Sequence, residues 1–173
     1  IWLEYDWFSS YNKKTDKLTP SIFFGSKTDN YYGAYKLLNH VFPKLPDISW
    51  ILNQARTLNM QLTQAGYMYG RKIPSLRVVF TTYSFPDIEK FISAIGLPIL
   101  HNSMFKTFLL DSNPSLLAIG LDIADSGIVS NAYGIEIYKE WMNNSAWSSL
   151  LDTLTKAYGK CSKVASLTDL FIS

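Results

Sequence analysis

The sequence predicts an α+β fold in which one mainly antiparallel sheet of about six strands carries its helices on one face. Three observations support this prediction. Strand-like segments come in pairs, the members of each pair are close in sequence, and each pair leads into a segment with helical periodicity. This strand–strand–helix order occurs three times, over residues 1–42, 61–96 and 116–159. Two smaller sheets would fit the same order, and both arrangements stay open at this point.

The first unit opens with the alternating segment IWLEYDW. Its odd positions are apolar, whereas its even positions hold Trp2, Glu4 and Asp6, which is typical of a half-buried strand. A second strand is expected at residues 20–25, and a helix at residues 31–42. Asp47 can then cap another helix, whose apolar stripe consists of Ile48, Ile51, Leu52, Ala55 and Leu58.

The second unit begins as a hairpin of residues 61–71 and 76–83 around the segment KIPS. If Arg71 lies opposite Leu76, one face of this hairpin carries Gly66, Met68, Gly70, Arg77, Val79, Thr81 and Tyr83. The following helix has the spacing of a capping box, with Ser84 at its start and Asp87 three residues later. Its apolar stripe is Ile88, Phe91, Ile92 and Ile95.

Gly96 is expected to end that helix in the left-handed conformation. Residues 97–114 then read as an irregular connection. The third unit ends in a helix that stops at Gly159 and has the apolar stripe Trp147, Leu150, Leu151 and Leu154. A short final helix is expected at residues 163–171.

The strand pair of the third unit, residues 116–138, has two unlike faces. Odd positions from Leu117 to Ile137 are mostly large and apolar, so this face should meet the helices. Even positions carry small or polar residues, among them Gly120, Asp122, Ser130, Gly134, Glu136 and Tyr138. Glycine in a strand often marks the close approach of a ligand or another chain segment. This face could be solvent-exposed, could bind a ligand, or could pack on a partner subunit.

Candidate polar groups on this face are Glu4, Asp6, Arg77, Tyr83, Asp122, Glu136 and Tyr138. With a turn at residues 125–127, Asp122 lies opposite Ser130, and Glu136 is then about 20 Å further along the hairpin. That separation disfavours a catalytic dyad of Asp122 and Glu136. An ion pair between Arg77 and one of the carboxylates is the more ordinary arrangement.

Composition limits the function classes. The chain has 173 residues, 47% of them apolar, which suits a single domain over residues 1–173. The chain opens without a methionine and inside a strand-like segment, so a missing N-terminal stretch before Ile1 is one expectation. A net charge of +2 gives no strong field for nucleic acid, and no apolar run is long enough to cross a membrane. One cysteine, Cys161, excludes an internal disulfide and favours a cytoplasmic location. No histidine has a metal-ligand spacing, no phosphate-binding loop is present, and no cofactor is expected.

The repeated strand–strand–helix units with polar residues on the inner strand face resemble those of the barrel prenyltransferases, although no motif of that family is matched. The sequence predicts a binding or biosynthetic accessory module that presents the small-residue face to a small molecule, a peptide or a protein partner, including a second copy. The alternative is a small metal-independent transferase or isomerase, with Glu136, Asp122, Glu4 or Asp6 as general base. Ligand contacts are expected from Arg77, Tyr83, Tyr138, Gly120, Gly134 and Ser130.

Overall fold

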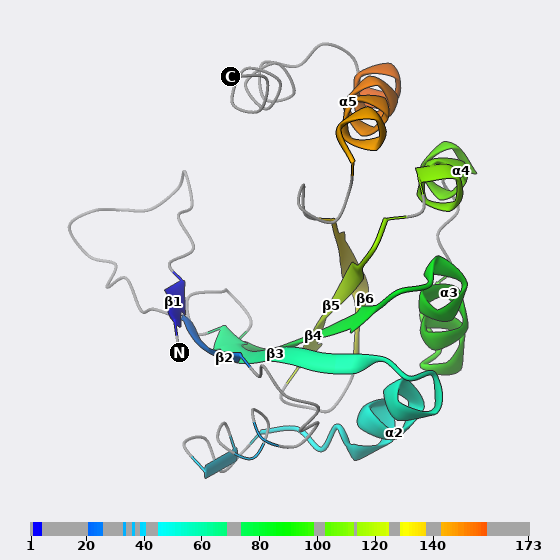
Figure 1. Cartoon of the computed structure of the whole chain (residues 1–173). Coiled ribbons are helices and arrows are strands. Elements are labelled where there is room, and N and C mark those ends of the chain that lie inside the picture. The colour runs from blue at the N-terminus through cyan, green and yellow to red at the C-terminus, as the bar shows by residue number, and fades with distance from the viewer. Residues whose placement is uncertain are drawn as a thin grey trace, which may run out of the picture.

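A computed structural model describes residues 2–4, 21–25, 45–68, 74–98, 103–112, 114–124, 129–137 and 143–158, with single residues between 33 and 40. The described strands form one antiparallel sheet in sequence order, β1 to β6, so the single-sheet prediction is confirmed (Figure 1). The strands are β1 (Trp2–Glu4), β2 (Ser21–Gly25), β3 (Gln61–Met68), β4 (Ser75–Thr82), β5 (Leu117–Ala124) and β6 (Val129–Glu136).

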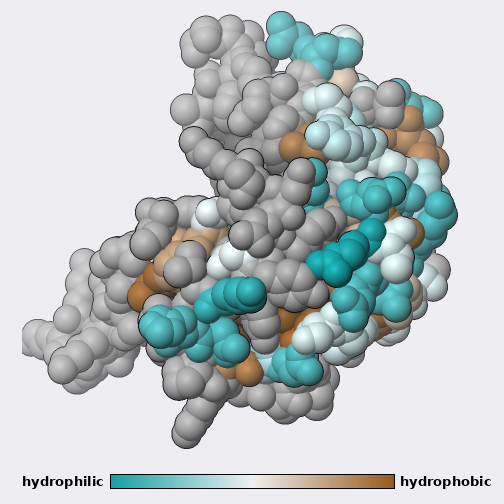
Figure 2. All heavy atoms as spheres, turned by 60° about the horizontal axis from the view of Figure 1, so that its bottom comes forward, coloured by the Kyte–Doolittle hydropathy of each residue, from teal (hydrophilic) through white to brown (hydrophobic). Residues whose placement is uncertain are grey.

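The described helices pack on one face of this sheet. They are α2 (Ser49–Thr57), α3 (Phe85–Ala94), α4 (Ser103–Ser112) and α5 (Asn144–Tyr158). Each of them contributes to a single buried core together with one side of strands β2 to β5. Figure 1 shows α2, α3 and α4 in a row along the sheet, with α5 beside α4. On the face shown in Figure 2, the coloured residues are mostly hydrophilic, with scattered hydrophobic ones between them.

Side-chain alternation assigns the two sheet faces as predicted. Leu117, Ile119, Leu121 and Ile123 are buried in the core under the helices. The same side of β4 carries Leu76, Val78 and Phe80. The predicted register of β3 and β4 is nevertheless wrong, and that of β5 and β6 holds only at the turn end, where Ile123 pairs with Val129. Arg77 lies opposite Gly66 rather than Gly70, and Glu136 lies opposite Ala118.

Both register errors leave the faces unchanged because they amount to an even number of residues. On β3 and β4 the observed pairing differs from the predicted one by four residues, which centres the turn two residues earlier, and the last described pair is Met68 with Ser75. On β5 and β6 the register shifts between Leu121 and Ile123. Because of this shift, Glu136 pairs two residues nearer to the β5–β6 turn than an unshifted ladder would place it.

The helix stripes are confirmed, whereas neither predicted cap forms as such, because the N-cap of α2 is Ile48 and Asp47 lies one residue before it. In front of α2, the Ser49 N–H donates to Asp47 Oδ1 at 2.9 Å, and the stripe Ile48, Ile51, Leu52 and Ala55 is buried. The hydrogen bond from the Ser49 hydroxyl, followed by that from the Ser49 N–H, lowers the pKa of the Asp47 carboxyl. Ser84 precedes α3 but makes no side-chain cap, so the predicted capping box does not form. Gly96 ends α3 with a φ of 74°, as expected for a left-handed stop.

Helix α4 was not predicted. Residues 97–114 read as an irregular connection, yet Ser103–Ser112 is helical, with Phe108 and Leu109 in the core. In the sequence, this helix is marked only by a short run of apolar residues around Phe108 and Leu109, so its periodic signal is short. The strand–strand–helix order is confirmed for the second and third units. The helices expected at 31–42 and 163–171 fall largely or wholly outside the described residues. Among those residues, no helix combines the length and apolarity needed to cross a bilayer.

Tyr133 of β6 links the sheet to the segment after α3, because its hydroxyl donates to the Pro98 carbonyl at 2.9 Å. Burial, with a smaller contribution from the Glu89 charge, raises the pKa of this hydroxyl above its ordinary 10.0. A raised folded-state pKa means that the stabilisation is complete below pH 10.0 and is lost as the pH rises through the folded value. Tyr133→Phe should therefore flatten the fall in unfolding free energy in urea titrations above pH 10.0. Tyr83→Phe, at an exposed position, is the matched control, and an equal flattening there would contradict the assignment.

Candidate functional site

The sheet face away from the helices, here called the second face, is covered over much of its area. Its residues alternate with the core positions on every strand. Several are nearly inaccessible to solvent, including Ser21, Phe23, Met68, Ser75, Val79, Thr81 and Ala118. A uniformly solvent-exposed face is therefore excluded. Asp122, Ala124, Gly134 and Glu136 on β5 and β6 are partly exposed on this face, and Gly25 on β2 is exposed.

One glycine of this face makes room for a side chain of the protein itself. Gly66 lies opposite Phe23, and a Cβ at Gly66 would come within 2.3 Å of the Phe23 ring. The ring thus lies directly on the backbone of β3. Glycine at a strand interior marked a close approach, as the sequence suggested, but at Gly66 the approaching group is an internal phenylalanine.

The charged part of the second face is built around Arg77. Arg77 of β4 and Asp122 of β5 are cross-strand partners, and their side chains form an ion pair with Arg77 Nε and Asp122 Oδ1 3.0 Å apart. Both side chains are about one-fifth exposed, at 24% and 18%. The contact is an ion pair and not an aligned hydrogen bond. This is the Arg77–carboxylate pair that the sequence favoured.

Glu136 approaches the same place from β6. Its Oε1 lies 3.2 Å from the point that a Cβ of Gly120 would occupy, and Arg77 Nε lies 3.8 Å from that point. Glu136 and Arg77 thus converge over Gly120, which has no side chain to separate them. The predicted separation of about 20 Å between the acids was too large, because the register shift draws Glu136 back along β5. Arg77, Asp122 and Glu136 are called the charged cluster below.

Next to the charged cluster the sheet has a second glycine, Gly134, directly opposite Gly120. Within the described part of the chain, no atom lies within 4 Å of the point that a Gly134 Cβ would occupy. The space above Gly120 is therefore occupied by the Arg77 and Glu136 side chains, whereas the described atoms leave the space above Gly134 open. The predicted ligand residues Arg77, Gly120 and Gly134 are brought together, alongside Asp122 and Glu136.

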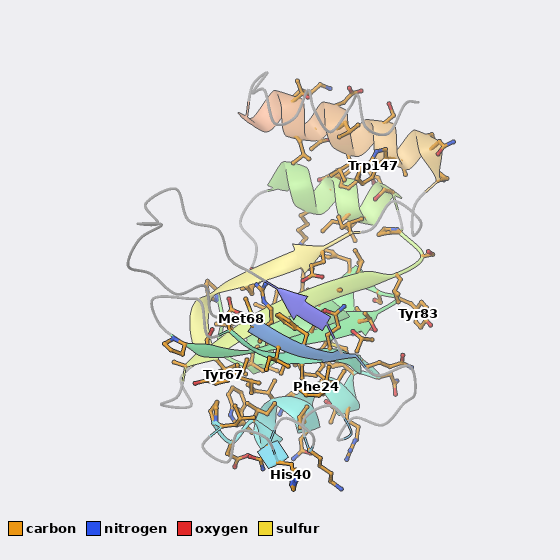
Figure 3. All side chains as sticks on the ribbon, turned by 90° about the vertical axis from the view of Figure 1, so that its left-hand side faces the viewer. Phe24, His40, Tyr67, Met68, Tyr83 and Trp147 are labelled. Carbon is orange, nitrogen blue, oxygen red and sulfur yellow. The ribbon has the colours of Figure 1, made fainter. Side chains whose placement is uncertain are left out.

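The remaining predicted residues do not join this group. Tyr83 lies beyond the end of β4, is 75% exposed and points away from the sheet, so its assignment to the second face was wrong (Figure 3). The hairpin was extended one residue too far, since β4 ends at Thr82. Glu4 lies on β1 and Ser130 on β6, but their side chains are not among the described ones. Asp6 and Tyr138 fall entirely outside the described residues.

The described residues include no cluster of three or more histidine, cysteine or acidic side chains that could hold a metal ion. Comparison with protein-family models, with curated protein sequences and with solved structures gives no match to this chain. What the site can do is therefore inferred from its own chemistry: a guanidinium held by one carboxylate, a second carboxylate beside it, and a glycine floor.

Proposed function

We propose that the protein is a binding module whose second face takes up a small polar molecule or a peptide segment at the charged cluster. The observation that carries this proposal is the space over Gly134, directly beside a partly exposed ion pair. A sheet face that only packed internally would be expected to fill such a position with a side chain. Binding sites commonly combine a small floor with a few fixed polar groups of this kind.

The charged cluster also indicates what the ligand should offer. Arg77 presents planar N–H donors, and its pairing with Asp122 limits the orientations of the guanidinium. Carboxylate oxygens of Asp122 and Glu136 accept hydrogen bonds. A ligand with both donors and acceptors, such as a peptide amide or a small amide-bearing molecule, would match this arrangement. A protein partner, including a second copy, could supply the same groups from an extended segment.

A ligand-observed NMR screen of amide-bearing fragments and short peptides tests the proposal. Hits should lose binding in Gly134→Val, because the new side chain fills the space beside Gly120. Arg77→Met should weaken the same hits by about tenfold or more, since it removes a charged donor. Gly25→Val is the matched control, at an exposed position elsewhere on the same sheet face. Hits that bind Gly134→Val and wild type equally would place the ligand elsewhere.

A second candidate is a metal-independent transferase or isomerase with Glu136 as general base. It is favoured by one observation, the position of the Glu136 carboxylate beside a fixed guanidinium over Gly120. A carboxylate can take a proton from a bound hydroxyl, amide or carbon acid, while a guanidinium can stabilise the developing negative charge.

The two candidates differ in what happens to a bound hit. Incubating each hit with catalytic amounts of protein, and following its ¹H NMR spectrum, separates binding from turnover. Conversion that is lost in Glu136→Gln but kept in Asp122→Asn would support Glu136 as the base. Unchanged spectra for every hit and hit pair would support the binding module alone.

A further inference from the structure

A cleft between α4 and α5 lies apart from the charged cluster and has its own chemistry. It has a volume of about 540 Å³, in the range of small-molecule sites. Figures 1 and 3 both show α4 and α5 side by side at the β5–β6 end of the molecule. The cleft is lined by Thr107, Phe108, Asp111 and Ser112 of α4, and by Asn143, Ser145, Ala146, Ser149 and Thr153 at or in α5.

The lining is dominated by hydroxyl groups set in two rows. On α5, Ser145, Ser149 and Thr153 follow each other at four-residue spacing and thus share one side of the helix. On α4, Thr107 and Asp111 have the same spacing. Packed helices usually bury apolar side chains at their contact. On α5, Leu150 and Leu151 are the side chains buried in this way. The cleft-facing rows are polar instead, so they do not serve helix packing.

Several of these polar groups have no hydrogen-bond partner among the described residues, whereas the Ser145 hydroxyl and the Ala146 N–H both donate to Asn143 Oδ1. Serine and threonine in a helix often donate to the carbonyl four residues earlier, and Thr155 does so, to Leu151 O at 2.8 Å. Thr107, Ser149 and Thr153 make no such side-chain bond within the described part of the chain. Ser112 Oγ is buried and has no hydrogen-bond partner there either. A buried unpartnered hydroxyl costs free energy, which a bound hydrogen-bonding ligand would recover.

We propose that this α4–α5 cleft binds a neutral, polyhydroxylated ligand, with the carbohydrates as the chemical class. The lining hydroxyls can donate to and accept from sugar hydroxyls, and the Asn143 amide group can donate, while its Oδ1 already accepts from Ser145 and Ala146. Asp111 can accept two neighbouring sugar hydroxyls in charge-assisted bonds. Among the described lining residues, Asp111 is the one charged group and no lysine or arginine occurs, so this part of the lining would repel a phosphate or carboxylate group on the ligand.

The test uses the full chain, uniformly labelled with ¹⁵N, titrated with glucose, maltose and trehalose as neutral probes. Glucose 6-phosphate and glucosamine are the anionic and cationic probes. Binding of at least one neutral sugar is expected, with amide shifts confined to α4 and the first half of α5. The anionic probe should bind at least about tenfold more weakly than glucose. The absence of saturable shifts with all three neutral sugars, or tighter binding of the anionic probe, would overturn the proposal. So would preferred binding of glucosamine over every neutral sugar, because it would make the cleft a cation site.

Variants locate the site within the molecule. Asp111→Ala should weaken sugar binding by about tenfold or more, because it removes a charge-assisted acceptor. Ser149→Ala should weaken it by about two- to fivefold, the loss of one neutral hydrogen bond. Thr155→Val is the matched control on the same helix, outside the cleft lining, and should bind as wild type does. Asp111 and Ser149 are exposed, so both variants should fold, as checked by unchanged far-ultraviolet circular dichroism. Equal affinities of wild type and Asp111→Ala would contradict the assignment.

Discussion

Phe91→Ala should lower the free energy of unfolding by about 3–5 kcal/mol, the largest single effect expected in this protein. Phe91 of α3 is fully buried, and its ring meets that of Phe80 on β4 edge to face, with centroids 5.3 Å apart. The contact joins the helix layer to the middle of the sheet. Truncation removes buried apolar area, leaves a cavity, and breaks an aromatic pair worth about 1 kcal/mol by itself.

Urea unfolding followed by circular dichroism measures this loss, with Ser93→Ala as the matched control. Ser93 is an exposed residue of the same helix, so its replacement should change stability by about 0.5 kcal/mol or less. Phe91→Leu keeps most of the volume and should cost clearly less than Phe91→Ala. A loss below about 1 kcal/mol in Phe91→Ala would mean that α3 is not anchored on β4 through this ring.

Gly66→Ala should destabilise the protein by about 1–3 kcal/mol, although alanine is the smallest possible addition. The new Cβ would fall within 2.3 Å of the Phe23 ring, and Phe23 is itself buried, so the ring cannot simply swing into solvent. Either the ring leaves its rotamer or β2 moves away from β3, and both cost free energy. Gly134→Ala is the matched control, because the described atoms leave room there, and its effect should be small.

A double-mutant cycle with Phe23→Ala identifies the cause. If the ring is what the new methyl group meets, Gly66→Ala should cost far less in the Phe23→Ala background than in wild type. The coupling should reach about 1 kcal/mol or more, as for residues in direct contact. Additive effects of the two substitutions would show that Gly66 is needed for another reason, such as its backbone conformation.

Local patterns predicted the faces and most elements correctly, because side-chain periodicity is a property of short segments. Leu117 to Ile123 alternate in the sequence as they do in burial, and the stripe of α3 is buried as its spacing indicated. The missed helix α4 and the absent cap at Ser84 have one cause in common. In each case the local signal left more than one structure open. The apolar signal of α4 is short, and the Ser84 side chain is compatible with more than one partner, so packing decided the outcome.

The candidate site was predictable in its members but not in its geometry. Arg77, Asp122, Glu136, Gly120 and Gly134 were all chosen from alternation and residue type, and they do lie together. Their approach over Gly120 depends on a register shift, and no residue type marks the place of that shift in advance. The hydroxyl-lined cleft depends on how α4 lies against α5, and so involves residues that are distant in sequence.

By itself, then, the amino-acid sequence determined the fold class, the pairing of neighbouring strands within a unit and which side of strands β4 and β5 faces the helices. These follow from periodicities of two and 3.6 residues, which act within a single element. Tertiary structure alone decided the pairing registers, the meeting of Arg77 with two acids, and the covering of Gly66 by Phe23. Those features depend on turn lengths and on contacts between separate elements. A change of one or two residues in a turn or in a pairing register gives the side chains new neighbours.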